Sequence, residues 1–355
     1  MPPDLAILPR FHCLGPSSRY RLFQFLPELA AAGLQVVTQP LFGAAYLRNR
    51  YQGGGWPVGL MLRAYLERMS FLRRLPPGTP LLIEKDLFPW LPASFELPWL
   101  RRHPFRLDLD DAVHVWYRRR PFLAGKFAAL ARRASCIQAG NRWLAREFAR
   151  YGAPVELIPT VIDPIPCQAN RNSAPGPGPL RVGWIGSPLS QEHLEPFWPV
   201  LERTDLPPLE LRIMGGNPRL ARGLPTRHRI VWLPWSTPAE REFLAGLDVG
   251  IMPLRPGPFS DGKCGFKLLQ YLAAGVPPIA TPTLANREIL GEGRYGALAA
   301  DPADWAAALR RLATDHDHWR ALAAAGPERV GTAYSRQVWA PRVVATLRDF
   351  VARRG

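Results

Sequence analysis

The segment Asp248–Pro282, read DVGIMPLRPGPFSDGKCGFKLLQYLAAGVPPIATP, decides the expected fold. Its apolar run Val249–Pro253 predicts a strand, and Pro278–Ala280 predicts another. Between them, the stretch Gly265–Ala274 predicts a helix. A strand, a helix and a strand in this order are typical of a βαβ unit in a parallel sheet.

The rest of the chain repeats this alternation on both sides of a polar stretch. Before it, we expect a helix over Arg19–Ala32 and strands at Leu5–Leu8, Leu34–Thr38, Pro80–Glu84, Phe105–Leu109, Cys136–Ala139 and Leu157–Pro159. After it, we expect a helix near Pro238–Gly246, strands at Leu180–Ile185, Leu209–Met214 and Ile230–Leu233, and only helices beyond Ala280. The predicted class is α/β, with two doubly wound, Rossmann-like domains and a ligand cleft between the carboxyl edges of their sheets.

The polar stretch Pro164–Pro179, PIPCQANRNSAPGPGP, has the composition of a linker. It is rich in Pro, Gly, Asn and Ser and has no apolar periodicity. A length of 355 residues suits two domains of about 150–200 residues each. We therefore expect one domain at residues 1–165, a linker at 166–179 and a second domain that begins at residue 180.

The chain is strongly basic, with a formal net charge of +16. Residues 1–170 carry 22 Lys and Arg against 12 Asp and Glu, and residues 171–355 carry 23 against 17. This excess indicates an anionic partner, although an arginine-rich composition explains it equally well. The four cysteines have no CxxC or Cys/His spacing, so neither disulfides nor structural zinc are expected. Without an apolar run of membrane length or a signal peptide, a cytoplasmic protein is expected.

The loop that precedes the predicted Gly265–Ala274 helix has the composition of an anion site. A helix N-terminus presents backbone N–H groups and the positive end of the helix dipole. Gly262 and Gly265 allow the backbone to approach a ligand closely, while Lys263 and Lys267 add positive charge for a bound diphosphate. The alternative is an ordinary strand–loop–helix connection with two solvated lysines.

The stretch Leu268–Pro277, LLQYLAAGVP, resembles the donor-site signature of retaining glycosyltransferase family four, the group 1 transferases of the GT-B fold. The family pattern has two glutamates separated by seven residues, and Gly262 and Gln270 stand at these positions. The resemblance implies a divergent subgroup, in which Gln270 bonds a ribose hydroxyl and Asp261 stands beside the first glutamate's position. Phe266 belongs to the same implied donor site.

Three further stretches extend the resemblance. RVGWIGS, ending at Gly186 and Ser187, is similar to the start of the family's donor domain. The position of Gly15 and Arg19, beside Arg21, resembles the glycine-rich loop that faces the donor diphosphate. A plain strand–helix turn explains that loop equally well. TAYSRQVWAPRV, at residues 332–343, is similar to the segment before the family's final helix. The donor domain is therefore expected to end at residue 335, with residues 336–355 packing back on the first domain.

Acidic residues directly after the predicted strand Phe105–Leu109 are candidates for catalysis. Residues 107–114 read LDLDDAVH, and carboxylates at the carboxyl edge of a parallel sheet lie where ligands gather. We expect Asp110 or Asp111 to contact the acceptor or sugar hydroxyls, with His114 nearby by resemblance. Two alternatives are an aspartate cap on a helix and a DxD metal pair of Asp108 and Asp110. The resemblance implies that no metal is used.

The stretch Trp56–Leu75 has apolar residues at helical spacing, with arginines between them at 63, 68, 73 and 74. It predicts a helix that lies on an anionic membrane surface, or a helix that faces the core with a solvated charged side. No nucleic-acid-binding module is recognisable.

The resemblance implies a hexosyltransferase that moves a sugar from a nucleotide-sugar donor to a glycan, lipid-linked or small-molecule acceptor, with retention of configuration. It further implies cell-surface polysaccharide assembly and no resident cofactor. The expected location is the cytoplasm, with peripheral association at the inner membrane face. A nucleotide-sugar epimerase of the same fold and a non-catalytic GT-B scaffold remain alternatives, because both family glutamates are missing.

Overall fold

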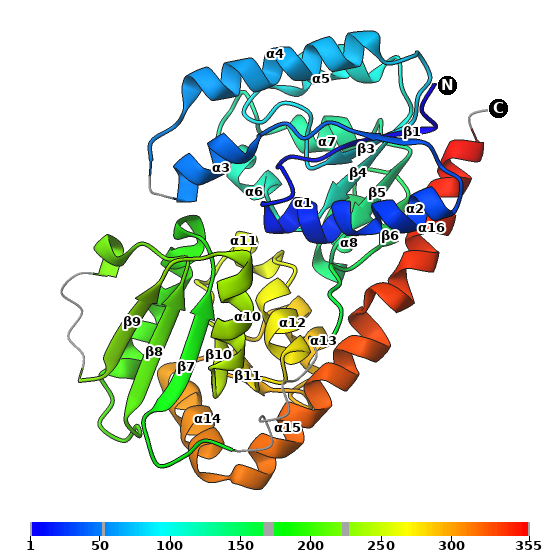
Figure 1. Ribbon diagram of the computed structural model, residues 1–355. Coiled ribbons are helices and arrows are strands. Elements are labelled where there is room, and N and C mark those ends of the chain that lie inside the picture. Colours follow the sequence, from blue (N-terminus) through cyan, green and yellow to red (C-terminus); the bar gives the residue numbers. More distant parts are fainter. Residues whose placement is uncertain (1, 52–53, 166–173, 222–226, 354–355) are drawn as a thin grey trace. The chain divides into compact units, whose positions relative to one another are not determined.

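The computed structural model describes residues 2–51, 54–165, 174–221 and 227–353, and the chain divides into two compact units (Figure 1). The first unit comprises Met1–Val161, Asp261–Cys264 and Arg336–Gly355. The second unit comprises Ile162–Ser260 and Gly265–Ser335. Most of the expected linker, residues 166–173, lies outside the described residues.

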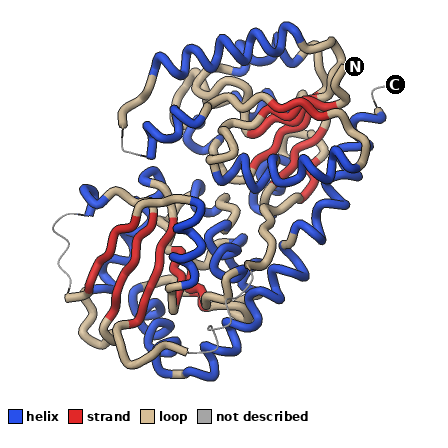
Figure 2. The backbone as a smooth tube through the Cα atoms, in the orientation of Figure 1, coloured by secondary structure: helices blue, strands red, loops and turns tan. Residues whose placement is uncertain are grey.

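The first unit is built on a parallel sheet of six strands, and strands are drawn in red in Figure 2. The strands are β1 (Leu5–Leu8), β2 (Val36–Thr38), β3 (Leu81–Glu84), β4 (Phe105–Leu109), β5 (Cys136–Ala139) and β6 (Val155–Leu157). Their order across the sheet is β2-β1-β3-β4-β5-β6. Every side chain of β1, β3, β4 and β5 is buried, as expected for parallel strands covered on both faces.

The expected continuous helix over Arg19–Ala32 is wrong, because the chain breaks there into α1, a 3-10 turn and α2. Leu22 has φ −127° and ψ −60°, outside the helical range, and Pro27 in the first turn of α2 lacks a backbone N–H. The helices of the first unit are α1 (Pro16–Arg21), α2 (Leu26–Ala31), α3 (Ala44–Tyr51), α4 (Val58–Arg74), α5 (Ala93–Leu100), α6 (His114–Arg118), α7 (Lys126–Ala131), α8 (Arg142–Ala149) and α16 (Arg336–Ala352).

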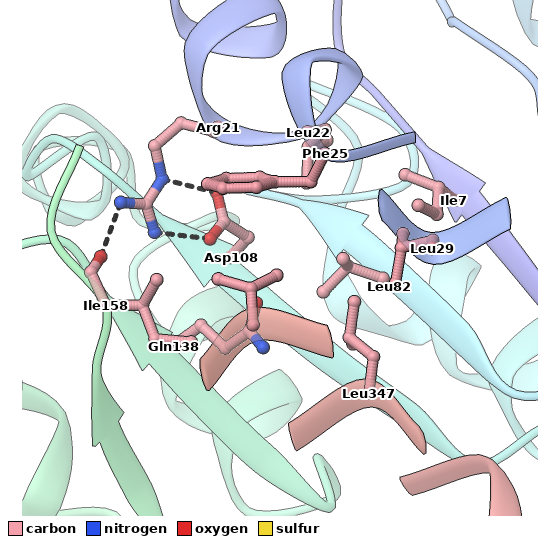
Figure 3. Close-up of a pocket in the computed structure, with 11 residues that line it drawn as sticks. Ile7, Arg21, Leu22, Phe25, Leu29, Leu82, Asp108, Gln138, Ile158 and Leu347 are labelled. Carbon is pink, nitrogen blue, oxygen red and sulfur yellow. Dashed lines mark hydrogen bonds and ion pairs between the residues drawn. The ribbon is translucent and has the colours of Figure 1, made fainter. Parts of the chain in front are cut away.

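A buried ion pair and the last helix complete the core of the first unit (Figure 3). The Arg21 guanidinium donates to the two carboxylate oxygens of Asp108 at 3.0 and 2.5 Å, and also to the backbone oxygen of Ile158. Beside this pair, α16 packs its buried face against apolar side chains of β1, α2 and β3. That face consists of Ala340, Val343, Leu347 and Phe350.

The second unit contains a parallel sheet of its own, in the order β12-β11-β10-β7-β8-β9. The strands are β7 (Leu180–Ile185), β8 (Leu209–Met214), β9 (Arg229–Leu233), β10 (Val249–Met252), β11 (Pro278–Ala280) and β12 (Ala297–Leu298). The short strand β12 was not expected from the sequence, which indicated only helices beyond Ala280. The two parallel sheets, each with its helices, confirm the predicted α/β class with two Rossmann-like units.

Helices and aromatic side chains fill the core of the second unit. Trp184 of β7, Phe197 and Trp305 are each no more than 2% exposed and belong to one apolar cluster. The helical segments are a 3-10 helix (Pro188–Phe197), α9 (Trp198–Leu201), a 3-10 turn (Pro218–Ala221), α10 (Thr237–Ala245), α11 (Pro258–Asp261), α12 (Phe266–Ala273), α13 (Leu284–Leu290), α14 (Pro302–Thr314), α15 (His316–Arg329) and a π-helical turn (Val330–Tyr334).

The burial of α16 predicts a large effect of truncating one of its side chains. Leu347 is 0% exposed, so Leu347→Ala removes buried methyl groups and leaves a cavity that costs about 2–5 kcal/mol. The measurement is the free energy of unfolding in urea. Leu66→Ala, at a leucine that is 63% exposed in the same unit, is the matched control and should change stability by less than about 0.5 kcal/mol. Equal effects of the two substitutions would contradict the packing of α16.

Candidate active site

Each sheet contains a switch point, where the strand order reverses direction. In the first unit β1 lies between β2 and β3, and in the second unit β7 lies between β10 and β8. Ligands of open parallel sheets bind beyond the carboxyl ends of the strands at such a point. The segments that follow β1 and β3, and those that follow β7 and β10, are therefore the candidate ligand sites of the two units.

The three clustered aspartates at the end of β4 are each held by a cationic side chain. Asp108 is bonded to an arginine, as described above, and the Asp110 carboxylate lies 3.1 Å from the Lys85 ammonium. The Asp111 carboxylate lies 3.5 Å from the Lys263 ammonium and accepts a backbone N–H at 3.1 Å. These ion pairs offset the repulsion between neighbouring carboxylates. The Asp110 side chain is 6% exposed and that of Asp111 is 26% exposed, so Asp111 is the more accessible to a ligand.

The same ion pairs concern the alternative that Asp108 and Asp110 bind a metal ion. Both members of the Asp108–Asp110 pair are engaged with cations. Among the residues that the structure describes, no group of three or more His, Cys, Asp or Glu side chains is arranged to hold a metal ion.

Sequence reasoning missed two charged residues at the end of β3. The fully buried Glu84 carboxylate accepts from the Ser17 hydroxyl at 2.7 Å and from the Arg10 backbone N–H at 2.8 Å. The Lys85 ammonium donates to the Ser17 oxygen at 3.4 Å. Burial disfavours the charged ammonium, but Asp110 and Glu84 outweigh burial and raise the pKa of Lys85 above its ordinary value. The signal was present, since charged residues follow an apolar run here just as they do in LDLDD.

Gly15 and Arg19 lie in the turn after β1. Gly15 precedes α1, and a Cβ atom there would lie 2.6 Å from the Cβ of Phe11, so close packing favours glycine. The Arg19 backbone N–H donates to the Gly15 oxygen at 2.9 Å, and its guanidinium lies 4.6 Å from the ring centre of Tyr20. The Arg21 guanidinium, in contrast, is buried in the ion pair with Asp108.

The expected donor-binding residues divide between the two units. Gly262 and Lys263 group with the first unit, whereas Gly265, Phe266, Lys267 and Gln270 group with the second. The Gly262 oxygen accepts from the Asn141 side chain at 2.9 Å. A Cβ atom at Gly262 would lie 2.4 Å from the Cβ of Ala112 and 2.8 Å from the Trp143 ring, so the first unit leaves no room for a side chain there.

His114 is placed in an aromatic cage. It is 2% exposed, and its ring lies 5.0 to 6.2 Å from the ring centres of Phe127, Trp143 and Phe148. Neither ring nitrogen has a hydrogen-bond partner among the described residues. Burial, with Arg118 adding to it, lowers the pKa of His114 to about 4. The ring is therefore neutral near pH 7, and its surroundings favour a packing role.

In the second unit, Gly186 and Lys267 both meet the buried Trp184 ring beside the switch point. A Cβ atom at Gly186 would lie 2.3 Å from that ring, and the Lys267 ammonium lies 5.3 Å from the ring centre. Ser187 caps the following 3-10 helix through a reciprocal bond with Ser190. The candidate residues at the ends of β7 and in α12 are thus brought to one place around Trp184.

The turn into α12 requires glycine at Gly265. Its φ of +69° lies in the left-handed region, and a Cβ atom there would lie 2.4 Å from a methyl group of Ile289. Gly265 is the N-cap residue of α12, and no side chain of the described residues caps this helix. Half-buried Phe266 is its first residue. The backbone therefore approaches any ligand at this helix end without an intervening cap.

Gln270 bonds to a carboxylate that sequence reasoning did not identify. Its amide nitrogen donates to the Glu240 carboxylate at 2.7 Å, and the Trp235 indole N–H donates to the other oxygen of the same carboxylate at 2.8 Å. Gln270 is 5% exposed and Glu240 is 8% exposed. Trp235 follows β9 and Glu240 lies in the first turn of α10, so this group also sits at the carboxyl edge of the sheet.

The helix α4 has two different faces. Ala64, Arg68 and Leu72 are buried, and the expectation that Arg68 lies among exposed arginines is wrong. Its guanidinium donates to the backbone oxygens of Pro9 and Gln39 at 3.1 and 2.8 Å, which explains its burial. The opposite face exposes Val58, Leu62 and Leu66 by 60 to 63%. None of the helices in the described ranges is long and apolar enough to cross a membrane.

The buried neutral state of His114 predicts a pH dependence of stability. Its pKa is about 4 in the folded protein and about 6.5 in an unfolded chain. Between these values the unfolded state binds the proton and the folded state does not, so stability falls as the pH drops from 6.5 to 4, by on the order of 2–3 kcal/mol.

The test compares urea unfolding of the wild-type protein and of His114→Phe at pH 7 and pH 4.5. The variant should lose less stability on acidification than the wild type, whereas His316→Gln, at an exposed histidine, should behave like the wild type. A wild-type protein and a His114→Phe variant that lose stability in parallel would contradict the assignment.

Known proteins are similar to this chain over both of its units. Residues 183–315 match the model of the family Glycosyl transferases group 1. No curated protein sequence is significantly similar to the chain. Among solved structures, sucrose-phosphate synthase from Thermosynechococcus elongatus aligns with a TM-score of 0.74 and 16% identity, covering 98% of this chain and 99% of that chain.

Two other solved structures are similar in fold. Anabaena HepE in complex with UDP-glucose has a TM-score of 0.69 and 13% identity, with 97% of this chain and 99% of that chain covered. A UDP-forming trehalose-phosphate synthase from Burkholderia xenovorans has a TM-score of 0.65 and 15% identity, with 98% and 99% covered. Residues 183–315 therefore match a Glycosyl transferases group 1 domain, and the chain as a whole has the two-domain GT-B fold of these solved structures.

Proposed function

We propose that the protein transfers a hexose from a nucleotide-sugar donor to a glycan, lipid-linked or small-molecule acceptor, with retention of configuration. The observation that carries the proposal is that Gly186 and Lys267 meet at the Trp184 ring, beside the switch point of the unit that contains the family match. In this proposal the second unit binds the donor and the first unit binds the acceptor. The reaction belongs to the assembly of a cell-surface polysaccharide.

The donor's diphosphate binds where backbone and positive charge meet. Gly186 and Gly265, at the end of β7 and before α12, add no side chain of their own between the backbone and a ligand, and the α12 N-terminus adds its dipole. Lys267, in the first turn of α12, contributes an ammonium group. Such fixed positive charges stabilise the leaving diphosphate as the glycosidic bond breaks. In this proposal they do so without a resident metal or other cofactor.

The acceptor binds at the carboxyl edge of the first sheet. Asp111 is the more exposed of the two candidate carboxylates and contacts an acceptor hydroxyl. Asp110 is held by Lys85, which keeps its carboxylate in a fixed position beside Asp111. Lys263 balances the charge of Asp111 until the acceptor arrives.

The test incubates the full chain with a panel of UDP-, GDP- and ADP-sugars and follows nucleotide release and donor isomerisation. UDP-glucose is the first donor to try, because HepE forms a complex with it. Nucleotide release that an acceptor accelerates, with the donor's anomeric configuration retained in the product, supports the proposal. Isomerised donor would indicate an epimerase, and the absence of binding to any nucleotide would indicate a scaffold.

Lys267→Ala probes the diphosphate site directly. Loss of the charged hydrogen bonds of the ammonium group should weaken donor affinity by on the order of 1.5–3 kcal/mol, measured by isothermal titration calorimetry. Arg294→Ala, an arginine of the same unit outside the candidate site, is the control and should bind the donor like the wild type. An unchanged affinity in Lys267→Ala would remove this lysine from the site.

We also propose that the protein associates peripherally with an anionic membrane through α4. Val58, Leu62 and Leu66 recur every four residues and form one exposed apolar stripe. Arg63 and Arg73 are exposed on the same helix, so apolar side chains and positive charge face solvent together. This combination binds the headgroup region of an anionic bilayer. A lipid-linked acceptor would then be within reach of the first unit.

Vesicle sedimentation tests the membrane surface. The wild type should bind vesicles containing phosphatidylglycerol better than vesicles of phosphatidylcholine alone, and salt should weaken the binding. Leu62→Gln combined with Leu66→Gln should reduce binding about tenfold or more, since each leucine loses part of its roughly 1.5–3 kcal/mol of burial. Leu189→Gln, at a leucine that is 60% exposed in the second unit, is the control. Unchanged binding of the double variant would contradict this assignment.

A further inference from the structure

In the chain of hydrogen bonds formed by half-buried Trp235 and buried Glu240 and Gln270, the direction of each bond is fixed. A carboxylate can only accept and an indole N–H can only donate. Glu240 therefore accepts from Trp235 at 2.8 Å and from Gln270 at 2.7 Å, so the Gln270 amide must turn its nitrogen toward Glu240. The Gln270 carbonyl oxygen then faces the other way, as a hydrogen-bond acceptor.

The three groups come from different parts of the second unit. Trp235 follows β9, Glu240 lies in the first turn of α10 and Gln270 lies in α12. A Cβ atom on Gly215, at the end of β8, would lie 3.4 Å from the Cβ of Trp235 and 2.2 Å from the Gly186 oxygen. The chain of hydrogen bonds thus connects with the backbone at the ends of β7 and β8, beside the switch point.

We infer that Glu240 is a positioning residue that orients Gln270 to accept a hydrogen bond from a hydroxyl group of the donor. Phosphate oxygens only accept, so an amide held with its carbonyl oxygen outward repels them and selects a hydroxyl. The site is thereby divided chemically. Lys267 serves the diphosphate, and the oriented Gln270 serves a hydroxyl of the ribose or of the transferred sugar. This inference rests on the proposed sugar-nucleotide function.

With Gln270 held in this way, the ligand meets a hydrogen-bond acceptor, as it would if position 270 carried a carboxylate. The charge resides on Glu240, and the Gln270 oxygen next to it is the acceptor that the ligand meets. Hydrogen bonds to a charged group are shorter and stronger than neutral ones, so the amide is held firmly and polarised. A glutamate substituted at position 270 alone would place two carboxylates in contact, which destabilises both ionised groups.

Exchanges between glutamate and glutamine test the inference, because they keep the size of the side chain and change only its hydrogen bonding and charge. In Glu240→Gln, the new amide accepts from the indole and turns its nitrogen toward position 270, so the Gln270 amide must flip. Its nitrogen then faces the ligand, and the affinity for UDP or for UDP-glucose should fall about tenfold while the Tm stays close to that of the wild type. Glu242→Gln, at an exposed glutamate of the same helix, is the control and should bind like the wild type.

The double variant, in which the residues at positions 240 and 270 are exchanged, is the more decisive test. In Glu240→Gln combined with Gln270→Glu, the new amide accepts from the indole and donates to the new carboxylate, so an acceptor faces the ligand again. Affinity should return to within about threefold of the wild type, whereas Gln270→Glu alone should lose about tenfold or more. A purely structural role of Glu240 would lower the Tm and would not be rescued in this way.

Comparing ligands shows whether the hydroxyl group belongs to the ribose or to the transferred sugar. If Glu240→Gln weakens UDP and UDP-glucose equally, and 2′-deoxy-UDP binds both proteins alike, the ribose is the partner. If only UDP-glucose is weakened, the partner is the transferred sugar. Wild-type affinity in Glu240→Gln would overturn this inference and leave the proposed function standing, whereas a wild-type protein that binds no nucleotide would overturn both.

Discussion

Asp108 is buried at the end of β4, and the Arg21 guanidinium from α1 holds both of its oxygens. Removing one partner of such a pair leaves an uncompensated charge in the interior, typically at a cost of about 3–5 kcal/mol. Asp110 and Asp111 repeat the arrangement with lysines that come from the turn after β3 and from the segment Asp261–Cys264. The acidic run of β4 therefore ties α1, β3 and that segment to one sheet edge. The candidate acceptor site depends on this pairing.

The fold was largely predictable because most strands are continuous apolar runs bounded by Gly, Pro or charged residues. Leu5–Leu8 and Val249–Met252 are examples, since parallel strands are buried on both faces and need an apolar run of only four residues here. The prediction failed where the determining factor was not periodicity. The expected helix over Arg19–Ala32 has suitable spacing, but Leu22 leaves the helical range. Strand β12 has only two residues, too few to show any period.

The candidate site was less predictable, because the partners of its residues come from distant parts of the chain. The glycines could be recognised from local sequence, since Gly265 precedes a helix whose apolar pattern is clear. Glu240 could not, because it becomes relevant only when α10 brings its carboxylate against Gln270, thirty positions away. The burial of Arg68 and of His114 was equally invisible, since an arginine within an amphipathic pattern and a histidine after aspartates look exposed in sequence.

At Lys85, the placement of a charged group costs the first unit some stability. Its φ of +67° lies in the region that favours glycine, and a non-glycine residue held there costs on the order of 1–2 kcal/mol. Glycine would relieve that strain but would remove the ammonium group that Asp110 and Glu84 share. At position 85, thermal stability therefore favours glycine, whereas an ordered carboxylate edge requires lysine. Such a conflict arises where selection acts on activity and not on stability alone.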